Sequence, residues 1–228
     1  MLFRSDPNGT NALLRQMVVI GHSQGGLLTK GTAVDSSDRI WRVLNTNRLE
    51  NLKMTDDQRA QIRRLLFLKP LPFVSRVVFI ATPHRGSYLA GSFVRRWAAR
   101  LVSLPGALVS SGTDLLRVSQ GSDTGKFLNG RVPPSLDGMS SKNPGLLAMA
   151  ELPVGPPIKS HSIVAVQGNG DYHEGRDGLV KYSSAHVDYA ESEFIVRSFH
   201  TCLDHPATIK EVRRILHEHL DRLPPVGK

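Results

Sequence analysis

Cysteine and long apolar runs are nearly absent from this chain. The single cysteine, Cys202, excludes an internal disulfide and a zinc site built from cysteines. No run of about 20 apolar residues occurs, so no transmembrane helix and no stable membrane insertion are predicted. The opening residues 1–6 are not followed by the apolar segment of a signal peptide, and a cytoplasmic location is the default expectation.

Acidic residues are fewer than basic residues in this chain. The chain has 29 Lys and Arg against 20 Asp and Glu, which gives a formal net charge of +9. The basic residues are scattered, as in the pairs Arg63-Arg64, Arg95-Arg96 and Arg213-Arg214, and each pair falls in a helix-like stretch. They form no block and are not interleaved with aromatic residues, so they are interpreted as solvated helix faces and no nucleic-acid partner is predicted.

The composition and pattern that are present indicate one globular α/β domain. The chain has 228 residues, of which 40% are hydrophobic and 21% charged. Apolar stretches alternate with helix-like stretches along the chain, which predicts a parallel sheet flanked by helices. The predicted strands are 16–20, 74–81, 161–167 and 193–197, and the clearest predicted helices are 25–34, 55–66 and 208–220.

The tract 87–158 differs from the rest of the chain. It combines two helix-like pieces, 89–102 and 107–118, with a loop-rich part that is punctuated by prolines such as Pro144. A tract of this length between two strands is usually functional. We therefore expect an inserted helical cap or lid over residues 87–158. Leucines in it such as Leu101 and Leu104 either favour an apolar substrate or are ordinary core residues.

The sequence Gly21-His22-Ser23-Gln24-Gly25-Gly26 follows an apolar strand and precedes a helix. This is the G-x-S-x-G pattern, in which a sharp turn exposes the serine at the N-terminus of the helix. Free N–H groups and the helix dipole favour a developing negative charge there. We predict that Ser23 is a nucleophile and that the N–H of Gln24 helps to hold an oxyanion.

A serine nucleophile needs a basic side chain, and that base needs a carboxylate. Both partners should follow later strands, because the carboxyl ends of parallel strands meet at one edge of the sheet. Asp177, in an Asp-Gly-Leu-Val turn, is the preferred acid, with Asp171 as second choice. His200, directly after the fourth strand, is the preferred base, and His205 is the second choice because a histidine before proline at a helix start more often caps the helix.

Together these motifs resemble the α/β-hydrolase superfamily, and its lipase and esterase branch in particular. The resemblance rests on Gly-His-Ser-Gln-Gly-Gly, Ala-Thr-Pro-His-Arg-Gly-Ser, Asp-Gly-Leu-Val-Lys-Tyr-Ser-Ser-Ala-His and a late histidine before the last helix. It implies Ser23 as nucleophile, Asp177 as acid, His200 as base and a mobile cap. It implies no metal and no organic cofactor.

The chain departs from that family at its N-terminal side. Family members have several strands before the nucleophile strand, whereas only about 16 residues precede it here, so the expected fold is an N-terminally truncated α/β-hydrolase-like one. The first strand would then have an exposed edge, which is an association hazard. Three explanations are open: a C-terminal fragment, a truncated gene product, or a small variant that covers this edge by forming a homo-oligomer. A second oxyanion donor is hypothesised in the turn 82–86 or in a partner chain.

The expected activity is hydrolysis of small-molecule or lipid carboxylic esters through an acyl-enzyme. Two alternatives stay open at this point. One is a weakly active or inactive half-domain that acts as an oligomerising or interaction module. The other is an acyltransferase or thioesterase that uses the same three residues.

Overall fold

The computed structural model describes residues 11–45, 47–87 and 140–223. Both helices expected at 89–102 and 107–118 lie outside these ranges, as does most of the expected cap. Among the described helices, none has the length and apolar character needed to cross a bilayer.

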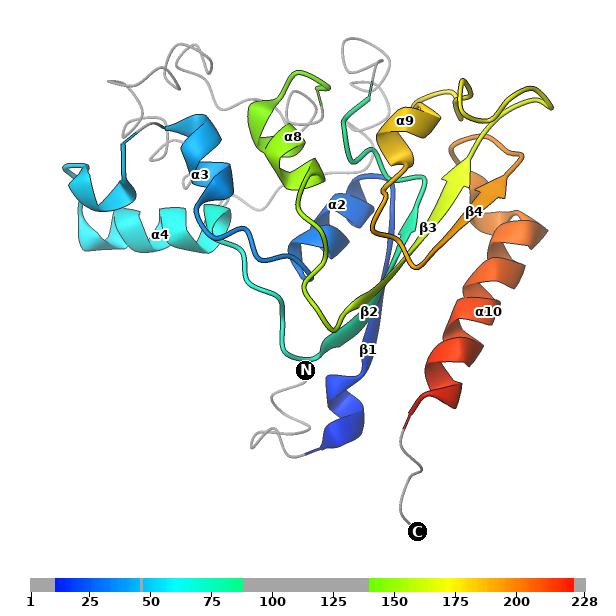
Figure 1. Ribbon diagram of the computed structural model, residues 1–228, viewed down its shortest axis with the longest axis horizontal. Helices are drawn as coiled ribbons and strands as arrows, with labels where there is room; N and C mark the ends of the chain where they lie inside the picture. Colours follow the sequence, from blue (N-terminus) through cyan, green and yellow to red (C-terminus); the bar gives the residue numbers. More distant parts are fainter. Residues whose placement is uncertain (1–10, 46, 88–139, 224–228) are drawn as a thin grey trace. The chain divides into compact units, whose positions relative to one another are not determined.

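The described residues form a parallel sheet of four strands in the order β1-β2-β3-β4 (Figure 1). The strands are β1 (Met17–His22), β2 (Val74–Ile80), β3 (Lys159–Ala165) and β4 (Ser192–Val196). The predicted parallel α/β architecture is therefore confirmed. The third strand begins and ends two residues earlier than predicted (159–165 against 161–167), because Lys159 and Ser160 pair with β2.

The helices and 3-10 turns of the described residues were only partly predicted. They are η1 (Ala12–Arg15), α2 (Gln24–Gly31), α3 (Arg39–Leu44), η2 (Leu49–Asn51), α4 (Asp56–Leu66), α8 (Pro144–Ala150), α9 (Tyr182–Ala185), η4 (Cys202–Asp204) and α10 (Pro206–Asp221). The predicted start of α4 is confirmed, because Thr55 and Gln58 form a reciprocal capping box. The prolines around residue 144 were interpreted as loop punctuation, but Asn143 accepts hydrogen bonds from two backbone N–H groups and Pro144 begins α8.

The chain divides into two compact units. One, called the sheet unit, comprises residues 1–34, 69–84 and 153–228 and carries all four strands. The other, called the helical unit, comprises residues 35–68 and 85–152. Its described part contains α3, α4 and α8, with a buried cluster of Trp41, Leu49 and Ile62.

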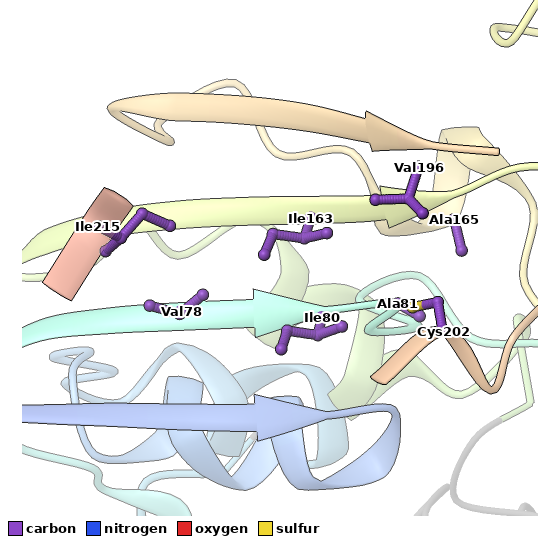
Figure 2. Packing of buried hydrophobic residues seen from close by; sticks show 8 residues of the cluster. All are labelled: Val78, Ile80, Ala81, Ile163, Ala165, Val196, Cys202 and Ile215. Atoms are coloured by element: carbon purple, nitrogen blue, oxygen red, sulfur yellow. The ribbon is translucent and has the colours of Figure 1, made fainter. Parts of the chain in front are cut away.

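The sheet unit has a hydrophobic cluster on each face of its sheet. Val78 and Ile80 of β2 pack with Ile215 of α10, as Figure 2 shows, whereas Val77 and Phe79 pack with Ala33 after α2. Alternate residues of a strand point to opposite faces, so α10 and the α2 segment cover opposite sides of the sheet. Each cluster packs one face of the sheet against the segment that covers it, and polar residues follow the carboxyl ends of the strands.

The apolar residues of α10 are not all buried. The spacing of Ile209, Ile215 and Leu220 predicts that they share one face of the helix. Ile215 is fully buried, but Ile209 is 48% and Leu220 58% exposed. These two residues lie near the ends of the helix, where periodicity alone does not tell whether the sheet still extends beneath.

Candidate active site

The turn between β1 and α2 places Ser23 in a strained conformation. Ser23 is the N-cap of α2, with φ of 54° and ψ of −127°. Positive φ is uncommon in a residue that has a side chain, and it persists only where the surrounding structure enforces it. The Ser23 N–H donates to the carbonyl of Ile80 at 2.9 Å, so the turn is anchored to the end of β2.

Two glycines allow this turn because other atoms approach them closely. A Cβ on Gly21 would lie 2.3 Å from Oγ1 of Thr29, and a Cβ on Gly26 would lie 1.9 Å from Oγ1 of Thr82. A Cβ on Gly25 would meet no atom within 4 Å. The first and last glycines of the Gly21–Gly26 sequence are therefore required sterically, and the middle one is not.

His200 connects the serine to a carboxylate. Its Nε2 lies 2.8 Å from Oγ of Ser23, and its Nδ1 lies 2.7 Å from Oδ2 of Asp177. An ionised carboxylate only accepts, so Nδ1 carries the proton that is donated to Asp177. Nε2 is then free to accept from the serine hydroxyl. His200 follows β4 by four residues, and Ser23 lies 177 residues away in sequence at the end of β1.

The carboxylate of Asp177 is buried and held by its own turn. Its side chain is 2% exposed, and Oδ1 accepts from the N–H groups of Leu179 at 2.8 Å and Val180 at 2.7 Å. Gly178 makes this turn with φ of 100°, which favours glycine. With Oδ1 engaged by the backbone, Oδ2 is left to accept from His200.

The second-choice residues lie outside this chain of hydrogen bonds. Asp171 is exposed and pairs with His173, whose backbone and side-chain hydrogen bonds lower the pKa of Asp171. His205 is the N-cap of α10, where its Nδ1 accepts from the N–H of Ala207 at 3.2 Å. The structure thus brings together Ser23, Asp177 and His200.

Two further backbone and side-chain features bear on the predicted oxyanion site. Gln24 is the first residue of α2, so its N–H has no acceptor within the helix. In the 82–86 turn, the ring of His84 is fully buried and packs edge-on against Phe79, with centroids 4.7 Å apart. The His84 side chain is therefore part of the core of the sheet unit.

The sequence patterns assign no role to His22. It is the last residue of β1, and its Nε2 lies 2.9 Å from the backbone carbonyl oxygen of His200. Burial lowers the pKa of His22, against a smaller opposing effect of the hydrogen bond to His200. Its position immediately before Ser23 was the only sequence signal for this contact, and that position does not reveal what the ring touches.

One group of side chains has the donor types of a metal site. Donor atoms of His161, Glu191 and Glu218 lie within 4.8 Å of one another. The guanidinium of Arg76 contacts both His161 and Glu218, and Arg222 also pairs with both glutamates. Side-chain cations already neutralise this group, and we interpret it as an ion-pair network between the sheet and α10.

A pocket of about 500 Å³ lies at the end of the sheet opposite to the serine. It is lined by residues at the amino ends of β1, β2 and β3 and by the last turn of α10, including Arg15, Arg76, Lys159 and Arg222. Ser23, Asp177 and His200 lie at the opposite, carboxyl ends of the strands. The chemistry of the site therefore does not involve this pocket.

The sheet unit has an α/β-hydrolase-like fold. Its parallel strands, its serine at a strand-to-helix turn, and the order of serine, acid and histidine along the chain correspond to the resemblance seen in the sequence. No protein-family model matches the chain, and no curated protein matches it.

Several solved structures are similar to the chain at low sequence identity. A metagenomic carboxyl esterase is 16% identical with a TM-score of 0.42, over 89% of this chain and 56% of that one. A lipase from Bacillus licheniformis in its mature form is 17% identical with a TM-score of 0.40, over 94% of this chain and 69% of that one. Human thioesterase 2 is 11% identical with a TM-score of 0.35, over 99% and 83%. The chain thus spans about half the length of the esterase.

Proposed function

We propose that the chain is a serine hydrolase that cleaves carboxylic esters through an acyl-enzyme. The observation that carries the proposal is the continuous path of hydrogen bonds from Ser23 through His200 to Asp177, at 2.8 and 2.7 Å. The strained backbone of Ser23 adds support, because such strain is concentrated at functional sites.

In the proposed first half-reaction, Oγ of Ser23 attacks the carbonyl carbon of the ester. The hydroxyl proton passes to Nε2 of His200, which already lies at hydrogen-bond distance. The oxyanion forms at the N-terminus of α2, where the N–H of Gln24 donates to it. As the tetrahedral intermediate collapses, the C–O bond breaks and His200 returns the proton to the leaving alcohol.

Water completes the proposed reaction by the same route. His200 removes a proton from water, the hydroxide attacks the acyl carbon, and the proton then returns to Oγ of Ser23 as the acid leaves. Asp177 holds the ring in the required tautomer in both half-reactions and stabilises the imidazolium. An apolar acyl chain is part of the proposal, and the cap leucines on which it rests lie outside the described residues.

The test combines a serine-directed fluorophosphonate probe with hydrolysis of short- and long-chain p-nitrophenyl esters. We expect labelling of the wild type and none of Ser23→Ala, with hydrolysis reduced on the order of 10⁶-fold, as for other serine nucleophiles. His200→Ala should lose activity on a similar scale. His205→Ala is the matched control: it should keep full activity and lose stability of about 1 kcal/mol at most, because it removes only a helix cap.

Three other outcomes would each point to a different function. A folded wild type that neither labels nor hydrolyses esters would overturn the proposal and favour the interaction module, for which the exposed side chain of Ile20 on β1 is the supporting observation. Labelling at Ser23 with thioester cleavage in place of ester hydrolysis would keep the nucleophile and change the acyl donor. Labelling with acyl transfer would keep the nucleophile and change the acceptor.

A further inference from the structure

Both backbone polar groups of His200 are hydrogen-bonded. The His200 N–H donates to the carbonyl of Asp177 at 2.9 Å, and the His200 carbonyl lies 2.9 Å from Nε2 of His22. The ring itself bridges Asp177 and Ser23. One backbone bond therefore ties the base to the acid, and the other ties it to the residue that precedes the nucleophile.

The acceptor at His22 determines its tautomer. A carbonyl oxygen can only accept, so Nε2 of His22 carries the proton that is donated. The two histidine rings are close, with centroids 5.0 Å apart and planes inclined at 42°. A neutral His22 can donate this bond without placing a second positive charge beside the imidazolium that forms on His200.

We propose that His22 is a positioning residue, which holds the loop of His200 at the distance from Ser23 that proton transfer requires. The inference rests on the proposed function. His22 and Ser23 are consecutive residues, so any movement of the end of β1 carries the nucleophile and the anchor of the base together. The distance between Oγ and Nε2 is thereby set by one short segment and does not depend on the long connections between β1 and β4.

The charge state of His22 fits this role. Burial is the main cause of its lowered pKa, and the nearby His200 ring acts in the same direction, while the hydrogen bond to the His200 carbonyl and the charge of Asp177 act against it. At neutral pH the ring is therefore an uncharged donor. Among the described residues, His200 and Asp177 are the titratable groups that act on His22, and both belong to the same hydrogen-bonded site.

Two variants of similar size distinguish the hydrogen bond that His22 donates from the packing of its side chain. His22→Gln keeps an N–H donor near the position of Nε2, whereas His22→Met fills a similar volume and donates nothing. We expect His22→Met to lower kcat by on the order of 10–10² with little change in KM, because a misplacement of about 1 Å at a reacting group has this scale of effect. His22→Gln should recover most of the lost activity.

A second readout reports the geometry of His200 independently of catalysis. The proton between Nδ1 of His200 and Asp177 should give a low-field ¹H NMR resonance, present in the wild type and in His22→Gln and broadened or lost in His22→Met. Thermal unfolding of each variant identifies general destabilisation. If His22→Met folds and retains wild-type kcat and the resonance, or if His22→Gln is as impaired as His22→Met, the positioning role is overturned.

The NMR measurement also distinguishes failure of the positioning role from failure of the proposed function. If the wild type does not label with the fluorophosphonate probe, the function is overturned. The resonance still tests whether His22 holds His200 against Asp177. If the wild type labels and both kcat and the resonance are insensitive to the variants at His22, only the positioning role fails.

Discussion

Neighbouring glycines after the serine should respond oppositely to substitution by alanine. A Cβ on Gly26 would lie 1.9 Å from Oγ1 and 2.6 Å from Cγ2 of Thr82, distances at which atoms must move. Overpacking of this kind typically costs about 1–3 kcal/mol, so we expect Gly26→Ala to lower the free energy of unfolding by about 2 kcal/mol. For a chain of this size that corresponds to a fall in Tm of roughly 4–8 °C.

Gly25 lies in the same helix, one residue earlier, with open space at its Cβ position. Alanine restricts the unfolded chain and favours the helix, so Gly25→Ala should raise the free energy of unfolding by about 0.5 kcal/mol. The two variants are matched in composition change and in element. They differ sterically, because Thr82 lies opposite Gly26 and no atom lies within 4 Å of a Cβ at Gly25.

Urea and thermal unfolding followed by circular dichroism measure both effects. The double variant Gly26→Ala/Thr82→Ala should recover part of the loss, because Oγ1 and Cγ2 are removed while the Cβ of Thr82, at 2.8 Å, remains. Equal destabilisation by Gly25→Ala and Gly26→Ala would refute the steric argument. So would a double variant in which the losses simply add.

Three further predictions follow from the site and the sheet. Asp177→Asn should lower kcat for ester hydrolysis by about 10⁴, because an amide does not hold the same tautomer of the base, while Asp171→Asn should leave kcat unchanged in the same assay. Burial, with the charge of Arg76, lowers the pKa of His161 to about 4, so the unfolded chain binds a proton there more readily than the folded one. The contribution of His161 to the free energy of unfolding should be complete above pH 6.5 and should fall by about 3 kcal/mol between pH 6.5 and 4, as measured by urea titrations. A variant His161→Gln whose unfolding free energy has the same pH dependence as the wild type would contradict this. We propose self-association through β1, an outer strand of the described sheet whose Ile20 is 42% exposed, and expect Ile20→Lys to reduce it in sedimentation velocity; a wild type that is monomeric at all concentrations would rule it out.

Local patterns were sufficient to predict the elements that surround the serine. An apolar β-branched run, a glycine-rich turn and a helix-forming segment are adjacent in sequence, so β1, Ser23 and α2 follow from neighbouring residues alone. The preference for Asp177 over Asp171 also had a local basis, because the Asp-Gly-Leu-Val turn returns apolar residues to the core. The segment of α8 was predicted as loop, and this error also has a local cause, because proline occurs both after the end of a helix and at its first position.

What only the tertiary structure decided is which distant groups touch. The register of four parallel strands brings His200 to Ser23 across 177 residues and aligns its ring with Asp177, and no spacing in the sequence encodes those distances. The contact of His22 with the carbonyl of His200 is hidden for the same reason, because a backbone carbonyl has no residue-specific signature. The sequence by itself determined that a serine stands at a strained strand-to-helix turn, followed by an acid and a histidine in order. The packing of the sheet determined that these groups come within hydrogen-bond distance of one another, because hydrogen bonds act over about 3 Å while sequence patterns record only order.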